Sequence, residues 1–226
     1  MLAELGVRFL DDEGQAVGTT PRELEELASV DASGLDARLA GLRIEVACDV
    51  DNPLLGERGA SAVFGPQKGA SPEDVDYLDS VLARWARLSG HAGLAGRPGA
   101  GAAGGLGFAL MAFLGARLEP GVELVARAVG LAEAVGGADL VLTGEGSVDA
   151  QTLAGKTPAG VARAAAAQGV PTVIVAGRVR PGAEVLLTTG CVALMSSSQG
   201  EVVPLAEVLR AAPQSTERAT ATVMQL

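Results

Sequence analysis

The clearest pattern along the chain is a helical repeat of apolar side chains between residues 72 and 88. Apolar residues recur there at every third or fourth position, at Val75, Leu78, Val81, Leu82, Trp85 and Leu88. This spacing places them on one face of an α-helix. The segment 71–74, Ser-Pro-Glu-Asp, comes directly before the repeat and contains residue types that begin helices, so the pattern predicts an amphipathic helix over 72–88.

Two other segments carry the same start signal. In the segment Thr20–Glu23, the threonine can cap a helix, the proline suits its first position and the glutamate can complete a capping box. The pair Thr157-Pro158 precedes an alanine-rich stretch, which predicts a helix that ends near Gly169.

Short continuous apolar runs predict the strands, at 5–10, 43–48, 138–142, 172–176 and 192–195. The last three runs alternate with helices expected at about 125–135, 158–168 and 204–211. This alternation is typical of βαβ units, and continuous apolar strands are typical of a parallel sheet buried on both faces. The fold class is therefore predicted to be α/β. A change in composition near 118–121 divides it into two lobes, 1–118 and 119–226, the second with a parallel βαβ sheet.

Composition narrows the function. The 17 basic and 27 acidic residues give a net charge of −10, which argues against a nucleic-acid or anionic-membrane binder. Two cysteines and one histidine argue against a disulfide scaffold or a two-histidine metal motif. The N-terminus lacks the pattern of a signal peptide, and the longest apolar run, 104–116, is too short to span a bilayer. A cytoplasmic protein without membrane or nucleic-acid partners is expected.

Glycine is abundant, at 31 of 226 residues, and clusters in the segment 99–107 ahead of an apolar run. Gly99, Gly101 and Gly104 fit the dinucleotide pattern G-x-G-x-x-G, but no strand precedes them, so an NAD site is discounted. With Gly105, these glycines could present backbone N–H groups to a phosphate or carboxylate at the start of a helix. They could equally provide a surface of small residues for close helix packing.

Polar residues follow the run 138–142, in the segment Thr143–Thr152. Ligands bind just beyond the carboxyl ends of strands in open α/β sheets, so this position favours a functional role. Glu145 and Asp149 are four residues apart in an expected short loop, where the two carboxylates could hold Mg²⁺ or accept a proton. The alternative is that these residues only form turns and helix caps.

The segment 150–157 nearly matches the phosphate-binding pattern G-x-x-x-x-G-K-[ST]. Ala150 replaces its first glycine and a loop precedes it, so a true P-loop is rejected. Lys156 could still supply a positive charge to a phosphate, or it could be a solvated lysine before a helix.

Beyond the run 43–48, the turn-forming residues Asp51 and Asn52 offer a carboxylate and an amide for hydroxyl recognition. Arg58 and Lys68 could meet a carboxylate or phosphate. Purely structural turns would explain this segment equally well.

Four segments of the chain resemble one family, the class I glycerate kinases. They are Asp49-Val-Asp-Asn-Pro-Leu-Leu-Gly, Val63-Phe-Gly-Pro-Gln-Lys-Gly, Pro98-Gly-Ala-Gly-Ala-Ala-Gly-Gly-Leu-Gly and Leu142-Thr-Gly-Glu-Gly-Ser-Val-Asp-Ala-Gln-Thr-Leu-Ala-Gly-Lys-Thr-Pro. They occur in family order, with suitable spacing, between about residues 5 and 200. The resemblance implies two α/β lobes with a cleft between them, and transfer of the ATP γ-phosphoryl group to a hydroxyl of D-glycerate with Mg²⁺. It leaves open which hydroxyl is phosphorylated.

Within that expectation, the lobe 1–118 lies on the substrate side and the lobe 119–226 is part of a Rossmann-like domain. Glu145, Asp149 and Lys156 are the expected catalytic residues, the first two also as metal ligands. Substrate binding is expected from Asp51, Asn52, Arg58, Lys68 and Gln151, and phosphate binding from Gly99, Gly101, Gly104 and Gly105.

The chain departs from the family at its start. Family members carry an N-terminal strand and an Asp-Ser-Phe-Lys-Gly-like loop with no counterpart here. The alternative function is therefore a truncated, non-catalytic relative that binds an anionic metabolite or a partner chain. An incomplete lobe would also favour self-association, for example as a homodimer.

Overall fold

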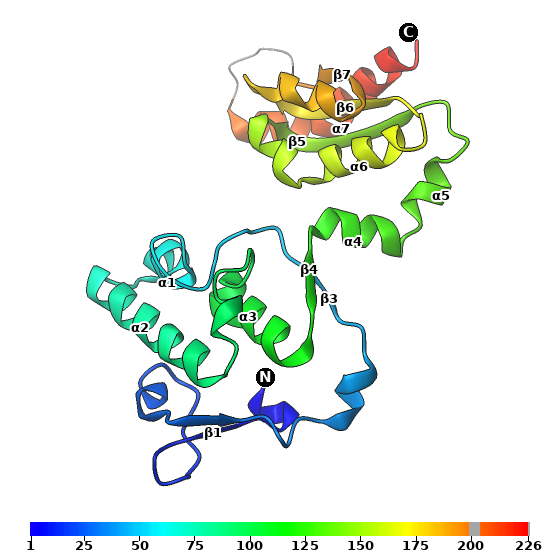
Figure 1. Ribbon diagram of the computed structural model, residues 1–226. Coiled ribbons are helices and arrows are strands. Elements are labelled where there is room, and N and C mark those ends of the chain that lie inside the picture. The colour runs from blue at the N-terminus through cyan, green and yellow to red at the C-terminus, as the bar shows by residue number, and fades with distance from the viewer. Residues whose placement is uncertain (199–203, 226) are drawn as a thin grey trace. The chain divides into compact units, whose positions relative to one another are not determined.

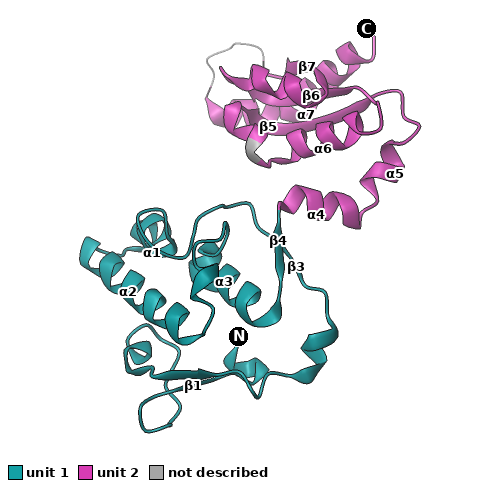
Figure 2. Cartoon of the chain, viewed as in Figure 1, with its two compact units in different colours: residues 1–119 teal, residues 120–226 magenta. Residues whose placement is uncertain are grey.

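The computed structural model describes residues 1–198 and 204–225. The chain forms two compact units, residues 1–119 and 120–226 (Figure 2). Each unit has its own apolar core, and the two are described separately below.

Unit 1, residues 1–119, combines two small strand pairs with three helices. β1 (Arg8–Leu10) pairs antiparallel with β2 (Ser29–Asp31), and β3 (Glu45–Ala47) pairs parallel with β4 (Arg117–Glu119). The helices are α1 (Ala60–Phe64), α2 (Pro72–Leu88) and α3 (Ala102–Leu114) (Figure 1). Their parallel pairing places the segment after β3 at the end of β4, where the Cys48 amide donates to the Glu119 carbonyl oxygen at 2.8 Å.

The core of unit 1 forms between α2 and α3. Phe108 of α3 is fully buried, and its ring meets the Trp85 ring of α2 edge to face, with centroids 4.9 Å apart. Leu54, from the segment after β3, is also fully buried in this cluster. Burying large aromatic side chains supplies most of the apolar stabilisation of such a core.

Helix α2 spans the residues that the periodicity predicts. The Ser71 hydroxyl accepts a hydrogen bond from the Asp74 amide at 3.1 Å, and the Asp74 carboxylate accepts one from the Ser71 amide at 2.8 Å. This reciprocal pair satisfies two N–H groups at the helix start. The local signal and the tertiary packing therefore agree for this element.

The start signal at Thr20 leads only to a 3-10 turn, Glu23–Glu26. The capping contact is present, since the Thr20 amide donates to the Glu23 carboxylate at 2.9 Å. At Leu27 the backbone becomes extended and the side chain is fully buried. Burial of Leu27 and the pairing of β2 prevent this turn from continuing as a helix.

Unit 2, residues 120–226, contains a three-stranded parallel sheet. β5 (Val141–Val148), β6 (Thr172–Val179) and β7 (Cys191–Ser196) lie side by side in chain order. The remaining elements are α4 (Gly121–Ala128), α5 (Leu131–Val135), α6 (Thr157–Ala166) and α7 (Leu205–Val223). This arrangement confirms the predicted α/β class and its parallel sheet.

The two faces of the sheet are covered by different helices. Ile174 and Ala176 pack with α6 on one face, whereas Val173 and Val175 pack with α7 on the other (Figure 1). Alternate residues of a strand point to opposite faces, which explains why β6 is continuously apolar from Val173 to Ala176.

Two helices in unit 2 differ from expectation. The helix expected at 125–135 is divided into α4 and α5, because Gly130 adopts a left-handed conformation at φ +67°. The helix expected at 204–211 extends to Val223 and contains Pro213. Buried contacts of Ala219 and Val223 with the sheet stabilise this extension. Among the described residues, no helix is both long and apolar enough to cross a membrane.

We expect Ser71→Ala to lower the free energy of unfolding by about 1 kcal/mol, because it removes the cap of α2. Chemical denaturation of the variant and the unaltered chain measures the difference. Ser71→Asp, which keeps an acceptor at the same position, is the control and should recover most of the loss. Equal stability of Ser71→Ala and the unaltered chain would contradict a capping role.

The stability contributed by Asp31 should depend on pH. Hydrogen bonds from the Ser33 side chain and amide, together with Arg8, lower the pKa of Asp31 to about 2. Because the pKa is lowered on folding, this contribution is present above the ordinary carboxyl pKa near 4 and is lost as pH falls towards 2. Asp31→Asn should therefore lower Tm at pH 7, by an amount that shrinks between pH 5 and pH 2.5. A Tm difference that is constant over this range would oppose the linkage.

Candidate active site

The segment after β3 lies directly against the glycine-rich loop. The Gly101 amide donates a hydrogen bond to the Asn52 carbonyl oxygen at 3.0 Å. A Cβ atom at Gly101 would lie 2.2 Å from the Pro53 carbonyl oxygen, so only glycine permits this approach. A Cβ atom at Gly99 would similarly lie 2.9 Å from the Cys48 sulfur. The structure thus brings Asn52 together with the predicted phosphate-binding Gly101, and it places Gly99 against Cys48.

Asn52 also organises the segment that follows it. Its side-chain amide donates to the Arg58 carbonyl oxygen at 2.8 Å, which closes the loop between the two residues. The Arg58 guanidinium meets the Asp51 carboxylate at 3.0 Å, and both side chains are more than two-thirds exposed. Such an exposed ion pair contributes little to stability. Asp51, Asn52 and Arg58 therefore form one polar cluster whose charged ends face solvent.

The glycine-rich loop is more tightly packed than the sequence suggests. The expectation of unpaired backbone N–H groups is wrong for Gly101 and Gly104, since the Gly104 amide donates to the Gly101 carbonyl oxygen at 3.2 Å. Gly105 is buried, and a Cβ atom there would lie 2.9 Å from Leu54. Close packing therefore explains much of the glycine content.

One part of this loop is nevertheless strained and exposed. Ala103 has φ +49° and ψ +42°, and the exposed Gly104 follows at φ +72°. A non-glycine residue in the left-handed region costs free energy, and such strained residues cluster at functional sites. The exposed turn at 103–104 is a polar backbone surface of the loop that a ligand can reach.

Lys68 lies at the end of a separate 3-10 turn, Pro66–Lys68, and its side chain is exposed. Within the described residues, no hydrogen bond or ion pair joins it to Asp51, Asn52 or Arg58. The structure does not bring Lys68 into their cluster through direct contacts.

In unit 2, the acidic segment differs from expectation. Strand β5 continues to Val148, so Gly144 and Glu145 pair with Val175 and Ala176 instead of forming a loop. Extended backbone rises about 3.3 Å per residue, which separates the Cα atoms of Glu145 and Asp149 by about 13 Å. The prediction that their carboxylates share one short loop is wrong. The extra pairing with β6 lengthens the strand.

Glu145 and Asp149 do not form a common Mg²⁺ site. Mg²⁺ takes oxygen ligands in octahedral geometry, commonly from one or two carboxylates and phosphate groups. The described part of the chain contains no group of three or more acidic, histidine or cysteine side chains that could hold a metal. Glu145 lies within β5 and Asp149 follows its end, so the two residues are too far apart to be expected to converge on one ion.

Asp149 is used as a helix cap. Its carboxylate accepts from the Gln151 amide at 3.0 Å, and its own amide donates to the Thr152 hydroxyl at 3.1 Å. Thr152 is fully buried. This arrangement supports the capping alternative for Asp149 and leaves the Gln151 side chain exposed. Lys156, five residues after Gln151, is exposed at the N-terminus of α6.

Two basic residues at the carboxyl end of β6 were not predicted. Arg178 pairs in register with Ser147, and the Arg180 amide donates to the Val148 carbonyl oxygen at 2.9 Å. Both arginine side chains are exposed. Ligands bind beyond the carboxyl ends of strands in open α/β sheets. The position of both arginines at the end of β6 is therefore the signal that could have identified them.

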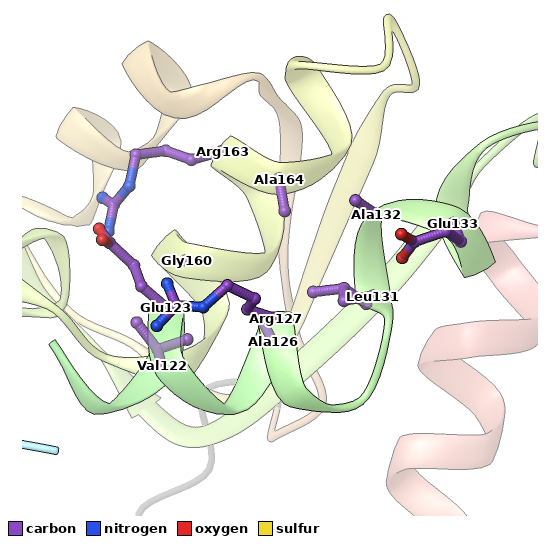
Figure 3. A pocket seen from close by; sticks show the side chains of 10 residues that line it. All are labelled: Val122, Glu123, Ala126, Arg127, Leu131, Ala132, Glu133, Gly160, Arg163 and Ala164. Atoms are coloured by element: carbon purple, nitrogen blue, oxygen red, sulfur yellow. The ribbon is translucent and has the colours of Figure 1, made fainter. Parts of the chain in front are cut away.

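A pocket of ≈ 420 Å³ lies elsewhere in unit 2, between α4, α5 and α6 (Figure 3). None of the predicted site residues lines it. Its charged lining consists of Glu123, Glu133, Arg127 and Arg163, and Glu123 and Arg163 point towards one another (Figure 3). Because the two signs balance, this pocket has no evident preference for an anionic substrate.

The chain is similar to proteins of known type over nearly all its length. It is 46% identical to the glycerate kinase of Bacillus subtilis (strain 168) over 96% of this chain and 58% of that protein. It is 46% identical to the glycerate 2-kinase of Escherichia coli (strain K12) over 78% of this chain and 47% of that protein. The chain thus spans about half the length of the curated relatives it matches.

A solved structure described as glycerate kinase 2 from Salmonella typhimurium LT2 aligns with all of this chain and with 58% of its own chain. The alignment has a TM-score of 0.79 and 42% sequence identity. The family model described as "Glycerate kinase family" matches residues 1–226. From its motifs, its fold and this match, the chain belongs to the glycerate kinase family.

Proposed function

We propose that the chain takes part in ATP-dependent phosphoryl transfer to a hydroxyl of D-glycerate. The observation that carries the proposal is the cluster of Asp51, Asn52 and Arg58 held against the glycine-rich loop by the bond from Gly101 to Asn52. The cluster offers a carboxylate and an amide for hydroxyl groups and a guanidinium for the carboxylate of glycerate. Family membership supports the same reaction.

In the proposed reaction, the acceptor hydroxyl oxygen bonds to the γ-phosphorus of ATP, and the bond from that phosphorus to ADP breaks. The hydroxyl proton passes to a base. Because the transition state of phosphoryl transfer is loose, positioning and charge stabilisation supply most of the rate enhancement.

We assign Glu145 as the base, because it is exposed whereas Asp149 accepts hydrogen bonds within its own turn. Lys156 and the exposed Arg178 supply positive charge for phosphate oxygens. Magnesium receives no binding residue in this proposal, since Glu145 and Asp149 do not form a common site. A cytoplasmic location is part of the proposal, because the reaction consumes ATP.

The similarity to a glycerate 2-kinase supports transfer to the hydroxyl on carbon 2. Phosphorus NMR of the product formed from D-glycerate and ATP distinguishes the 2-phosphate from the 3-phosphate. Exclusive formation of the 3-phosphate would overturn this part of the proposal.

The second candidate function is glycerate binding without catalysis. It is favoured by the internal use of the Gly101 and Gly104 amides, which donate to carbonyl oxygens of the chain itself. A coupled ADP-release assay separates the two functions. Turnover that depends on D-glycerate supports the kinase, whereas saturable glycerate binding without ADP release supports the binding protein.

Glu145→Gln should lower kcat at least about a hundredfold, because the amide cannot accept the proton from the acceptor hydroxyl. The KM for D-glycerate should change little. Glu133→Gln, which alters an acidic residue of the pocket between α4, α5 and α6, is the matched control. Full turnover in Glu145→Gln would remove Glu145 from the mechanism.

Arg58→Ala should raise the KM for D-glycerate about tenfold, through loss of a charge-assisted hydrogen bond to the substrate carboxylate. Arg38→Ala is the matched control, since Arg38 pairs with Asp36 at 2.6 Å away from the cluster. Steady-state kinetics with varied glycerate measures both variants. An unchanged KM in Arg58→Ala would exclude Arg58 from carboxylate recognition.

A further inference from the structure

Helix α2 contributes an acidic side chain to the loop that carries the proposed substrate-binding residues. The Gly56 amide donates to both carboxylate oxygens of Asp79, at 3.2 Å to Oδ1 and 3.3 Å to Oδ2. Asp79 lies 23 residues further along the chain and is half-buried. This contact therefore joins the tip of the loop to a separate element of unit 1.

The loop around Gly56 is held by backbone hydrogen bonds on both sides of its tip. Before the tip, the Leu54 amide donates to the Ala95 carbonyl oxygen at 2.8 Å. After it, the Gly59 amide donates to the Gly56 carbonyl oxygen at 2.8 Å. Gly56 itself has φ +83°, a left-handed conformation. Glycine adopts left-handed and right-handed conformations about equally readily, so Gly56 does not fix this turn by itself. An external acceptor that binds its N–H selects one conformation of this turn.

The conformation at Gly56 determines the direction of the chain into Arg58, two residues later. Arg58 is in turn linked back to Asn52 through its carbonyl oxygen and to Asp51 through its side chain. A change at Gly56 would therefore shift the guanidinium relative to the Asn52 amide.

Helix α2 is a rigid support for Asp79. Its start is capped by Ser71, and near its other end Trp85 is buried against Phe108. Arg84 also donates to the Leu27 carbonyl oxygen at 2.8 Å, which attaches the helix to the segment before β2. A side chain on this helix is held more precisely than one on a loop.

We propose that Asp79 is a positioning residue for glycerate binding: it holds the Gly56 turn and thereby orients Arg58 and Asn52 towards the substrate. Asp79 does not itself touch the substrate. The inference rests on the proposed function, because it assigns the loop 51–58 to recognition of glycerate. It predicts that the effect of losing Asp79 falls on glycerate recognition more than on ATP use or on folding.

The test compares Asp79→Ala, Asp79→Asn and the control Asp76→Ala in the full chain. Asp76 is exposed on the same helix, three residues before Asp79, and makes no described contact with the loop. Asp79→Ala should raise the KM for D-glycerate about tenfold and leave kcat and the KM for ATP within about twofold. In Asp79→Asn, the side-chain carbonyl still accepts from Gly56, so the KM should return to within about threefold of the unaltered chain.

Hydrogen exchange of the segment 54–59, followed by mass spectrometry, reports the position of the loop without relying on activity. Faster exchange there in Asp79→Ala, with exchange in α3 unchanged, separates loss of the turn from general destabilisation.

The outcomes distinguish this inference from the proposed function. If the unaltered chain is active and Asp79→Ala has an unchanged KM for glycerate, the inference is overturned and the proposed function stands. If Asp79→Ala weakens glycerate and ATP use equally, Asp79 has only a structural role and the inference is again wrong. If the unaltered chain neither binds nor phosphorylates glycerate, the proposed function fails and the inference fails with it.

Discussion

The candidate site of unit 1 depends on one close approach between two backbone segments. The Gly101 amide reaches the Asn52 carbonyl oxygen because neither Gly99 nor Gly101 has a side chain to obstruct the segment after β3. Any larger residue at Gly101 would collide with the Pro53 backbone. This contact positions Asn52, and the bond from Asn52 to the Arg58 carbonyl then positions the charged end of the loop.

The same need for close backbone packing explains why most of the glycine-rich loop is buried and only part of it is exposed. Most of its glycines serve packing: a Cβ atom at Gly107 would lie 2.0 Å from the Gly99 carbonyl oxygen, and Gly105 faces Leu54. Its exposed residues are Ala103 and Gly104 of the strained turn and the neighbouring Leu106. The glycine-rich loop therefore serves mainly as a packing surface for the polar residues 51–58, and its exposed turn is a small part of it.

In unit 2, strand pairing in the parallel sheet determines which polar side chains are available to bind a ligand. Pairing of β5 with β6 as far as Val148 and Val179 places Ser147 beside Arg178. The carboxyl ends of parallel strands lie at the same edge of the sheet, so exposed arginines of β6 join the lysine at the start of α6 as sources of positive charge. The two acidic residues have different structural roles. Glu145 lies in β5, whereas Asp149 stabilises the turn that follows the strand.

The sequence by itself determined the elements whose signals are local. Helix α2 follows from its apolar spacing and its cap, and the parallel sheet of unit 2 follows from apolar runs that alternate with helices, because these patterns depend only on neighbouring residues. Only the tertiary structure decided where β5 ends, since Gly144 and Ser147 are turn-forming types that become strand through pairing with β6. It also decided that the Gly101 amide is occupied, because its acceptor at Asn52 lies 49 residues earlier and no local pattern specifies that encounter.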